Sequence, residues 1–332
     1  MQLKIIKKKI SLDLYNVQTI ITSNLFSNIP FINSSCFFFE KNEQGKLFRS
    51  IVLLLISRAL GYTGQQHVWF AAIIELIHLA TLIHDDVVDQ ASVRRGMKTF
   101  NAQFGNTRAV LFGDFIYSKA FQMMAISKDL KILRILSNAT NRIAEGEIFQ
   151  LQNIGNVYIT PKEYMLIIEN KTAVLFEATA LIASQLSKNI TALQQREIQS
   201  YGRTIGLIYQ LVDDIQDYNK KKIFTGKFQG KDLLEGKVTL PLILAFSTNL
   251  KYKKKAEIIF NNNSCKKFSL LYEFVLNSNS QIYINRLLNY LINEAQKSIN
   301  VLPNSLYKQS LLKLPEILVC ELIKKKNEMN EI

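Results

Sequence analysis

Residues 74–89 read IELIHLATLIHDDVVD, and residues 206–217 read GLIYQLVDDIQD. In both stretches apolar side chains recur at helical spacing, and the run ends in the pattern DDxxD. A helix that is apolar on most of its faces is normally buried in a protein core. Each stretch therefore predicts a buried helix that brings three carboxylates to its C-terminal end.

The rest of the chain also favours helices. Its 332 residues include only five prolines, with none between Pro30 and Pro161 or between Pro161 and Pro241. Proline breaks helices because it lacks a backbone donor, so such stretches suit long helices better than many short strands. Apolar residues make up 48% of the chain and charged residues 20%, which supports a large core and excludes global disorder. We predict an all-α fold.

The chain carries a formal net charge of +14. Such an excess suits nucleic acid, an anionic membrane surface or small anionic substrates. No zinc, RNP-like or helix-turn-helix signature accompanies the charge, so we predict no nucleic-acid partner. The cysteines (Cys36, Cys265 and Cys320) are scattered, which argues against a disulfide scaffold and suits a reducing compartment.

The most membrane-like segment is residues 68–83. It contains Glu75 and His78 and runs directly into Asp85. Charged groups inside and at the end of an apolar run favour a buried core helix over a transmembrane one. The basic start, MQLKIIKKKI, precedes no apolar run of secretory length. We expect a soluble protein without a transmembrane segment.

Residues 1–25 are predicted to form a loosely attached N-terminal arm, and residues 26–332 a single all-helical domain. One helix is predicted to begin with Thr160 as its N-cap, Pro161 at the first helical position and Glu163 in the first turn. The Lys- and Asn-rich segment 249–267 is expected to be a surface insertion or a flexible link.

The two acidic clusters share one spacing. Asp85 and Asp89 are four residues apart and lie on one helical face, and Asp213 and Asp217 repeat this pattern. Like charges this close disfavour a helix unless a cation neutralises them. Carboxylate oxygens are hard donors, which Mg²⁺ and Mn²⁺ prefer. The clusters are therefore candidate divalent-metal sites.

Basic residues follow each cluster, with RRG at 94–96, GK at 226–227 and GK at 236–237. Arginine forks and lysine ammonium groups fill the lone pairs of phosphate oxygens that a metal leaves free. Carboxylates and cations in this order predict a site for a diphosphate.

With these motifs the chain resembles the trans-isoprenyl diphosphate synthases, the polyprenyl synthetase family, over residues 25–325. Within that family it resembles long-chain prenyl transferases of plastid and cyanobacterial type. Two DDxxD motifs, the first followed by RRG, are specific to the family. Other strings that resemble it are GDFIYSKAF at 113–121, EGEIFQLQ at 145–152, KTAVLFEA at 171–178 and GKVTLP at 236–241.

The resemblance implies a single large helical bundle around a central cavity, and a homodimer. It implies a prenyltransferase that joins isopentenyl diphosphate to an allylic diphosphate, repeatedly, to give a long-chain all-trans polyprenyl diphosphate. About three Mg²⁺ ions would be held by the six aspartates: Asp85, Asp86, Asp89, Asp213, Asp214 and Asp217.

Roles for other residues follow from the same resemblance. It implies that Thr172, Gln210 and the carbonyl of Lys171 steady the allylic cation, and that the departing pyrophosphate takes the proton. The implied contacts of the allylic diphosphate are Arg94, Lys171, Lys227 and Lys237. Those of isopentenyl diphosphate are Lys46, Arg49, His78 and Arg95.

The family pattern GGKRxRP appears here as QGKLFRS at residues 44–50. Lys46 and Arg49 keep their spacing on one helical face, whereas Leu47 and Ser50 replace the intervening Arg and the final Pro. We expect substrate binding to survive this departure.

Product length is predicted from Ala80 and Thr81, which lie one turn before the first motif, about 6 Å deeper along the helix. Short-chain members of the family place bulky aromatic residues there. Ala and Thr leave a tunnel open, which favours a long product, and the side chain of plastoquinone is one such product. A short-chain geranylgeranyl or farnesyl diphosphate synthase remains the alternative.

Three other classes compete with this interpretation. Glu75 and His78 form the ExxH element of di-iron bundles, but with only His67, His78 and His84 no second ExxH exists. A class I terpene cyclase usually replaces the second DDxxD motif. A non-catalytic regulatory subunit of a heteromeric synthase should lose carboxylates, and both sets are intact.

The Lys-, Ile- and Asn-rich composition is typical of an AT-rich genome. The protein is therefore expected in a plastid, the chloroplast, if it is plastid-encoded, and otherwise in the cytoplasm of an AT-rich bacterium. Release of a long prenyl product is expected at a membrane surface.

Overall fold

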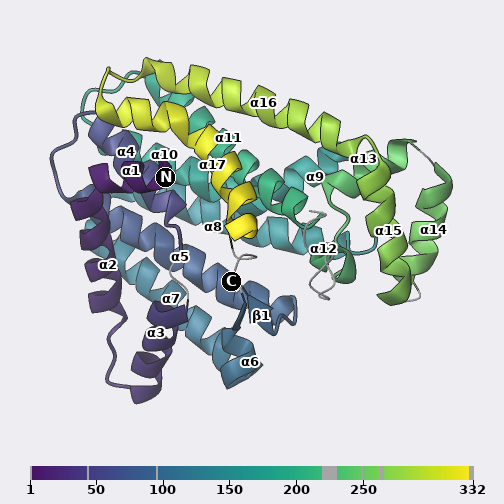
Figure 1. The fold of residues 1–332 in the computed structure, drawn as a ribbon. Coiled ribbons are helices and arrows are strands. Elements are labelled where there is room, and N and C mark those ends of the chain that lie inside the picture. The colour runs from purple at the N-terminus through teal and green to yellow at the C-terminus, as the bar shows by residue number, and fades with distance from the viewer. Residues whose placement is uncertain are drawn as a thin grey trace. The chain divides into compact units, whose positions relative to one another are not determined.

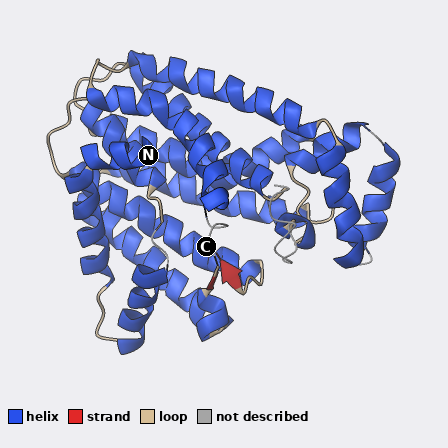
Figure 2. Cartoon of the chain, viewed as in Figure 1, coloured by secondary structure: helices blue, strands red, loops and turns tan. Residues whose placement is uncertain are grey.

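The computed structural model describes residues 2–42, 45–94, 96–218, 230–248, 250–261 and 265–328. Helices dominate these residues, and the strands among them form one two-stranded hairpin (Figure 2). The predicted all-α fold is confirmed. The chain divides into two compact units: unit 1 comprises residues 1–140, 178–195 and 302–310, and unit 2 comprises residues 141–177, 196–301 and 311–332.

Unit 1 is built mainly from the first part of the chain (Figure 1). Its elements are α1 (Gln2–Lys9), α2 (Ser11–Leu25), α3 (Pro30–Asn42), α4 (Phe48–Ala59), α5 (Gln66–Val88), β1 (Val93–Arg94), β2 (Met97–Lys98), α6 (Phe100–Phe104), α7 (Asn106–Ser127) and the start of α8 (Leu130–Gln152).

Helix α5 is the centre of unit 1 and contacts α2, α4, α6 and α7. Its residues from Phe70 to Ile74 are fully buried, because this run is apolar on every face of the helix. Among the described residues α5 is the one helix long and apolar enough to cross a membrane. Most of its apolar stretch is buried inside the protein, as expected for a core helix.

Helices α1 and α2 occupy the predicted N-terminal arm. Helix α2 packs against α4, α5 and α7, and it buries Asp13 beside Arg58 and His67. The guanidinium of Arg58 donates to both Asp13 oxygens, at 2.8 and 2.6 Å. Buried contacts therefore attach α2 to unit 1, while the predicted division at residues 25 and 26 stays a prediction.

Unit 2 holds most of the later elements. They are the rest of α8, α9 (Pro161–Ile168), the π-helix η1 (Glu169–Ala173), α10 (Val174–Gln185), α11 (Ala192–Gln216), α12 (Lys231–Leu234), α13 (Leu240–Thr248), α14 (Leu250–Asn261), α15 (Cys265–Asn277), α16 (Ser280–Ser298), the 3₁₀-helix η3 (Ile299–Val301) and α17 (Leu306–Glu328). Parts of α10, α11 and α17 belong to unit 1.

The start of α9 confirms the predicted cap. Thr160 Oγ1 accepts from the backbone N–H of Glu163 at 3.2 Å, and the Glu163 carboxylate accepts from the N–H of Thr160 at 2.8 Å. Pro161 needs no hydrogen-bond partner at this position because it has no N–H. Local chemistry alone fixes this helix end.

Of the two alternatives predicted for residues 249–267, the flexible link was wrong where the structure describes them, and the surface insertion stays a prediction. Residues 250–261 form α14, and α15 begins at Cys265. Ala256, Ile259 and Phe260 are buried, and their helical spacing puts them on one face of the helix. The many lysines hid this apolar face, which packs α14 against α13 and α15.

Candidate active site

The first aspartate motif lies at the C-terminal end of α5, in unit 1. Asp85 and Asp86 are in its last turn, and Asp89 is its C-cap, with its N–H bonded to the Asp85 carbonyl at 2.8 Å. The C-terminal end of a helix carries a negative partial charge, which disfavours carboxylates there. A cation bound at this end would offset both the helix dipole and the repulsion among the three side chains.

Asp86 is the buried member of the first motif, with 3% of its surface exposed. Arg94, on strand β1, donates to its Oδ1 from Nε and Nη2, both at 2.9 Å. Asp85 and Asp89 are partly exposed. The structure thus pairs two predicted site residues, Asp86 and Arg94, and leaves the other two carboxylates facing outward in part. Arg95 lies outside the described residues.

Three of the residues predicted to bind isopentenyl diphosphate lie on or next to α4 and α5 of unit 1. Arg49 lies in the first turn of α4 and is buried, and Lys46 precedes the helix. Leu47, the N-cap between them, has a left-handed φ of 56°, a strained conformation for a bulky residue. His78 lies on α5, two turns before Asp85, and is partly exposed.

The Glu75 carboxylate binds Ser50, so its place on α5 has a structural reason that needs no metal. Its Oε1 accepts from the backbone N–H of Ser50 at 3.1 Å and from the Ser50 hydroxyl at 2.7 Å. A carboxylate at the N-terminus of a helix is favourable, so Glu75 ties the start of α4 to α5. This contact holds the segment that carries Lys46 and Arg49.

The second aspartate motif ends α11, in unit 2. Asp213 is exposed, whereas Asp214 is 5% exposed and fully hydrogen-bonded. The Tyr164 hydroxyl donates to Asp214 Oδ2 at 2.6 Å, and Gln210 Nε2 donates to Oδ1 at 2.7 Å. Burial, with the charges of Asp213 and Asp217, outweighs these hydrogen bonds and raises the pKa of Asp214 to about 7.

Asp217 follows the helix and binds the start of α12. Its Oδ1 accepts from the backbone N–H of Lys231 at 3.0 Å, and its Oδ2 accepts from that of Asp232 at 2.9 Å. Asp232 itself was not predicted. Burial and the charges of Asp217 and Asp214 raise its pKa, while Lys237 lowers it. Asp232 is therefore a further carboxylate in the field of the second motif.

Lys171 and Thr172 lie in the π-helix η1, a form of helix that occurs frequently at functional sites. The Lys171 ammonium contacts Glu147 at 2.7 Å and donates to Gln150 at 2.8 Å, both on α8. The Thr172 hydroxyl donates to Gln210 Oε1 at 2.7 Å. One continuous chain of hydrogen bonds thus runs from Thr172 through Gln210 and Asp214 to Tyr164.

The predicted basic residues of the second motif are only partly described. Lys237 is largely buried and pairs with Glu235 at 2.8 Å. Lys227 lies outside the described residues. On α5, Ala80 is fully buried, and the Thr81 hydroxyl donates to the His78 carbonyl at 2.8 Å. The tunnel role predicted for Ala80 and Thr81 stays a prediction.

Sequence reasoning missed Tyr164, Glu147 and Gln150 as well as Asp232. Glu147 and Gln150 lie in the string EGEIFQLQ, and Asp232 lies just before the GK pair at 236–237, so both strings offered a signal. Tyr164 offered none, because its position opposite Asp214 depends on how α9 packs on α11.

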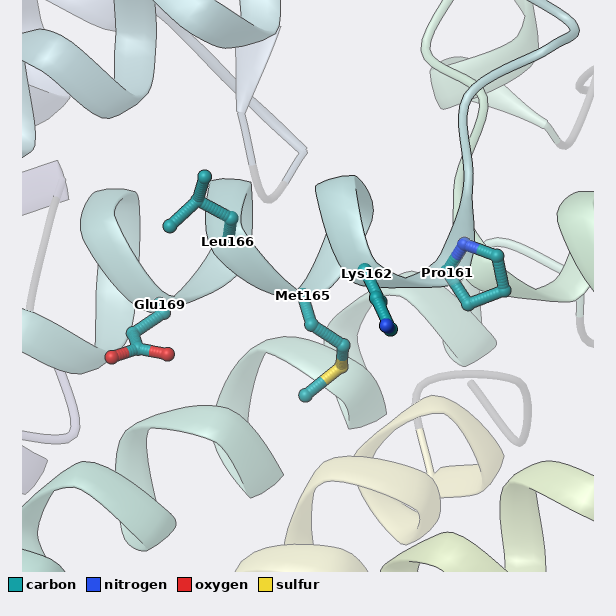
Figure 3. A pocket seen from close by; sticks show the side chains of 5 residues that line it. All are labelled: Pro161, Lys162, Met165, Leu166 and Glu169. Atoms are coloured by element: carbon teal, nitrogen blue, oxygen red, sulfur yellow. The ribbon is translucent and has the colours of Figure 1, made fainter.

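Two further observations bear on ligands. Within the described part of the chain, no three Asp, Glu, His or Cys side chains lie close enough together to hold a metal ion by themselves. A surface pocket of about 370 Å³ lies on α9 (Figure 3). It contains none of the predicted site residues and is lined by Pro161, Lys162, Met165, Leu166 and Glu169.

Known proteins share both the sequence and the fold. The family model described as polyprenyl synthetase matches residues 37–274. Octaprenyl diphosphate synthase of Escherichia coli (strain K12) is 45% identical over 245 residues, 74% of this chain and 75% of that protein. Solanesyl-diphosphate synthase 2, chloroplastic, of Oryza sativa subsp. japonica is 32% identical over 225 residues, 66% of this chain and 56% of that protein.

A crystal structure of polyprenyl synthase from Caulobacter crescentus CB15, complexed with calcium and isoprenyl diphosphate, has the same fold. It matches with a TM-score of 0.87 at 28% identity, covering 96% of this chain and 97% of that one. The family model spans most of this chain, and both DDxxD motifs lie inside the matched residues. The chain belongs to the polyprenyl synthetase family.

Proposed function

We propose that this protein is a prenyltransferase that condenses isopentenyl diphosphate with an allylic diphosphate and repeats the reaction to give a long-chain all-trans polyprenyl diphosphate. The observation that carries the proposal is the pair of DDxxD motifs, each at the C-terminal end of a helix with a buried apolar face. The likeness to octaprenyl and solanesyl diphosphate synthases supports the long product.

The six aspartates of the two motifs are the proposed metal ligands. Their donor set consists only of carboxylate oxygens, which suits Mg²⁺, an ion that keeps waters and takes its remaining ligands from substrate phosphates. When bound, Mg²⁺ supplies positive charge that stabilises the leaving diphosphate. The exposed Asp213 and the partly exposed Asp85, Asp89 and Asp217 are the members of the set most open to an incoming ion.

Cationic side chains complete the proposed binding of the allylic diphosphate. Phosphate oxygens repel carboxylates and need cations to neutralise them. The proposed cations are Arg94, Lys171, Lys227 and Lys237. In the structure Lys171 and Lys237 each contact a glutamate, so binding of the diphosphate exchanges one anionic partner for another. Such an exchange keeps each ammonium paired in both states and avoids leaving a partly buried charge alone.

Cleavage of the allylic C–O bond leaves a carbocation, which oxygen dipoles can stabilise. Thr172, Gln210 and the carbonyl of Lys171 are the proposed sources of these dipoles. The chain of hydrogen bonds from Thr172 to Tyr164 fixes the orientation of the Gln210 amide and of Asp214. Dipoles fixed before the reaction need no reorganisation when the charge develops.

The second substrate, isopentenyl diphosphate, is assigned to Lys46, Arg49, His78 and Arg95. Its double bond attacks the cation, a new C–C bond forms, and the proton lost from the neighbouring carbon passes to the departing pyrophosphate. Ala80 and Thr81 are the proposed lining of the tunnel that receives the growing chain.

The oligomeric state, the compartment and the place of product release also belong to the proposal. We propose a homodimer, located in the chloroplast if the gene is plastid-encoded and in the bacterial cytoplasm otherwise. The chloroplastic relative supports the first location and the Escherichia coli relative supports the second. A long apolar product requires release at a membrane surface, because its exposure to water is unfavourable.

The test is a condensation assay on the purified protein. Labelled isopentenyl diphosphate is combined with dimethylallyl, geranyl or farnesyl diphosphate, with Mg²⁺ or with EDTA, and the products are sized. We expect a Mg²⁺-dependent ladder that ends in long prenyl diphosphates. A ladder ending at farnesyl or geranylgeranyl diphosphate would support the short-chain alternative. A folded protein that condenses no primer would contradict the proposal and favour the regulatory subunit.

A further inference from the structure

The π-helix η1 separates α9 from α10 within what would otherwise be one continuous helix. A π-turn adds a residue to the helical turn and so changes the direction of the side chains beyond it. Consecutive residues of η1 consequently contact different helices. Lys171 contacts Glu147 on α8, and Thr172 contacts Gln210 on α11.

The two residues before Lys171 are each bound by an arginine. On α8, Arg142 donates from Nε and Nη2 to Asn170 Oδ1, at 3.1 and 3.0 Å. On α11, Arg203 donates from Nε and Nη2 to the two oxygens of Glu169, at 2.9 and 2.6 Å. Arg142 Nη2 also lies 3.5 Å from Glu169 Oε1. The two guanidinium groups therefore bind the first residues of η1 from two different helices, α8 and α11.

A third contact links Arg142 to the helix beyond η1. Its Nη1 lies 3.4 Å from Glu177 Oε2 on α10, and Gln199 of α11 donates to the other oxygen of Glu177 at 2.5 Å. Arg142 thus binds residues within η1 and one residue beyond it, on α10. The Glu177 side chain is 12% exposed and that of Glu169 is 22% exposed, so the carboxylates are shielded from water more than the arginines that bind them.

Two glycines bring the neighbouring backbones close to η1. A Cβ at Gly146, on α8, would lie 2.8 Å from the backbone nitrogen of Lys171 and 2.9 Å from Asn170 Cβ. A Cβ at Gly206, on α11, would clash with Cα of Ala173. The backbone of η1 is therefore confined on the same two sides from which the arginines bind it.

We propose that Arg142 and Arg203 are positioning residues for prenyl transfer. They hold η1 in its π-register through Asn170 and Glu169, and this register directs Lys171 toward α8 and Thr172 toward α11. The inference rests on the proposed function, in which Lys171 and Thr172 act on the allylic substrate. Each arginine acts through the η1 residue that it binds, and Glu169 also lines the pocket on α9 (Figure 3).

The test compares Arg142→Met with Arg134→Met, which removes an exposed arginine two turns earlier on the same helix. For Arg142→Met we expect kcat to fall by about 10–100-fold, the effect of a small misplacement of reacting groups. KM for the allylic diphosphate should rise, and KM for isopentenyl diphosphate should stay within about twofold of the wild type. Arg134→Met should behave as the wild type.

Conservative variants show whether the effect of Arg142 depends on the geometry of its hydrogen bonds or only on its charge. Arg142→Lys keeps the charge but cannot place two donors on Asn170 Oδ1, so we expect it to remain impaired. Asn170→Asp keeps the acceptor oxygen and should remain active, whereas Asn170→Leu should resemble Arg142→Met. The double variant Arg142→Met with Asn170→Leu should be no worse than Arg142→Met alone, because loss of Arg142 already removes its hydrogen bonds to Asn170.

Hydrogen exchange of the backbone supplies a readout that is independent of activity. Amides of residues 169–174 should exchange faster in Arg142→Met than in Arg134→Met. If the wild type condenses no substrate, the proposed function fails, and hydrogen exchange still tests the register. If Arg142→Met does not fold, Arg203→Met replaces it, since that side chain is 49% exposed.

The proposal is overturned if Arg142→Met, or Arg203→Met in its place, changes neither kcat nor exchange. It is also overturned if Arg142→Lys restores full activity, because charge alone would then suffice. A fall in thermal stability with unchanged kinetics would reduce the arginines to structural ion pairs and would equally exclude the positioning role.

Discussion

At the scale of single residues, the carboxylates within each motif differ in their surroundings. Asp86 and Asp214 are buried and hydrogen-bonded within the protein, whereas Asp213 is exposed and Asp85 and Asp89 are partly exposed. Removing a buried carboxylate leaves the groups that donate to it unsatisfied, which destabilises the fold. Substitutions at exposed and buried members of one motif should therefore have different consequences.

Asp85→Ala and Asp213→Ala should each lower turnover by at least about a hundredfold, the scale of losing one group that stabilises a developing charge. The thermal midpoint should stay near that of the wild type, because both side chains are accessible to water. Steady-state condensation and thermal unfolding measure the two effects. Glu197→Ala, on the same helix as Asp213, is the matched control. Near-normal turnover in either variant would contradict the metal assignment.

Ala80→Phe should shorten the products, because its ring would project from α5 one turn before the first motif. Ala80 is fully buried, so the larger side chain should also cost about 1–3 kcal/mol of stability. Product sizing on the same primer is the measurement. Leu82→Phe, two positions further along α5, serves as the control and should leave the ladder unchanged. An unaltered ladder for Ala80→Phe would place the tunnel elsewhere.

At the scale of elements, close contacts between helices depend on the absence of a side chain. Helix α11 approaches η1 at Gly206, where a Cβ would occupy the space of the Ala173 backbone. Backbone atoms cannot move aside as a flexible side chain can. The packing of α11 on η1 therefore admits glycine and no larger residue without a shift of the helix.

Gly206→Ala should lower the free energy of unfolding by about 1–3 kcal/mol, as overpacking does, despite the better helix propensity of Ala. Denaturant unfolding measures the change. Ser200→Ala, at an exposed position of α11, should leave stability nearly unchanged. A Gly206→Ala variant as stable as the wild type would show that α11 and η1 can separate at no cost.

The ion pair between α2 and α4 should respond to acid. Burial raises the pKa of Asp13, but hydrogen bonds and charges from His67 and Arg58 outweigh burial and hold this pKa well below its usual range. A lowered folded-state pKa contributes stability that is complete above the unfolded value, about 4, and is lost as the pH falls through the folded value.

Asp13→Asn should therefore lower the free energy of unfolding by about 1–3 kcal/mol at pH 7. The difference from the wild type should shrink steadily below about pH 4. Denaturant unfolding at several pH values measures it, with Asp114→Asn, at an exposed site of unit 1, as the control. A difference that stays constant down to pH 2 would mean that the charge of Asp13 contributes nothing.

How far the sequence predicts these elements depends on how local their causes are. The start of α9 was predicted to the residue, because Thr160, Pro161 and Glu163 make it by themselves. The π-helix was not predicted, because the extra residue at 169–173 is stabilised by Arg142, Gly146 and Gly206 from distant parts of the chain. Helix α14 was missed because its lysines hide a narrow apolar face.

The site residues also divide into those that the local sequence suggests and those that depend on distant parts of the chain. The aspartates and basic residues have characteristic spacing, so sequence alone suggested them. Asp232 lies in a string that offered a signal, whereas the role of Tyr164 arises from packing, since Tyr164 is far along the chain from Asp214 and approaches it only in the folded unit. Position in the sequence gives no sign of such a contact.

At the scale of the whole molecule, helix α17 contributes to both units. Its residues 306–310 belong to unit 1 and its residues from 311 onward to unit 2. Within unit 2, Leu311, Leu314, Ile317 and Leu318 are buried, and the Leu311 carbonyl accepts from the buried hydroxyl of Tyr201 at 2.8 Å. The last helix is therefore part of the core.

A chain that ends at residue 301 should fail to fold cooperatively. Exposing the surface covered by these four side chains costs about 6–12 kcal/mol, which is comparable with the whole stability of a typical domain, about 5–15 kcal/mol. Loss of a single thermal transition in calorimetry is the measurement. Tyr201→Phe, which removes only the hydrogen bond to Leu311, is the control and should retain one transition. A cooperative transition in the shortened chain would refute this role of α17.

The division of the chain between the units also has a consequence for its biosynthesis. Unit 1 needs residues 302–310 and unit 2 needs residues from 311 onward, so neither is complete until the codons for these residues have been translated. At about 5–20 residues per second, the apolar helix α5 leaves the ribosome roughly 10–50 seconds before these segments exist. The nascent polypeptide should therefore require chaperone protection throughout elongation, and synonymous codons that slow translation after α5 should lower its yield.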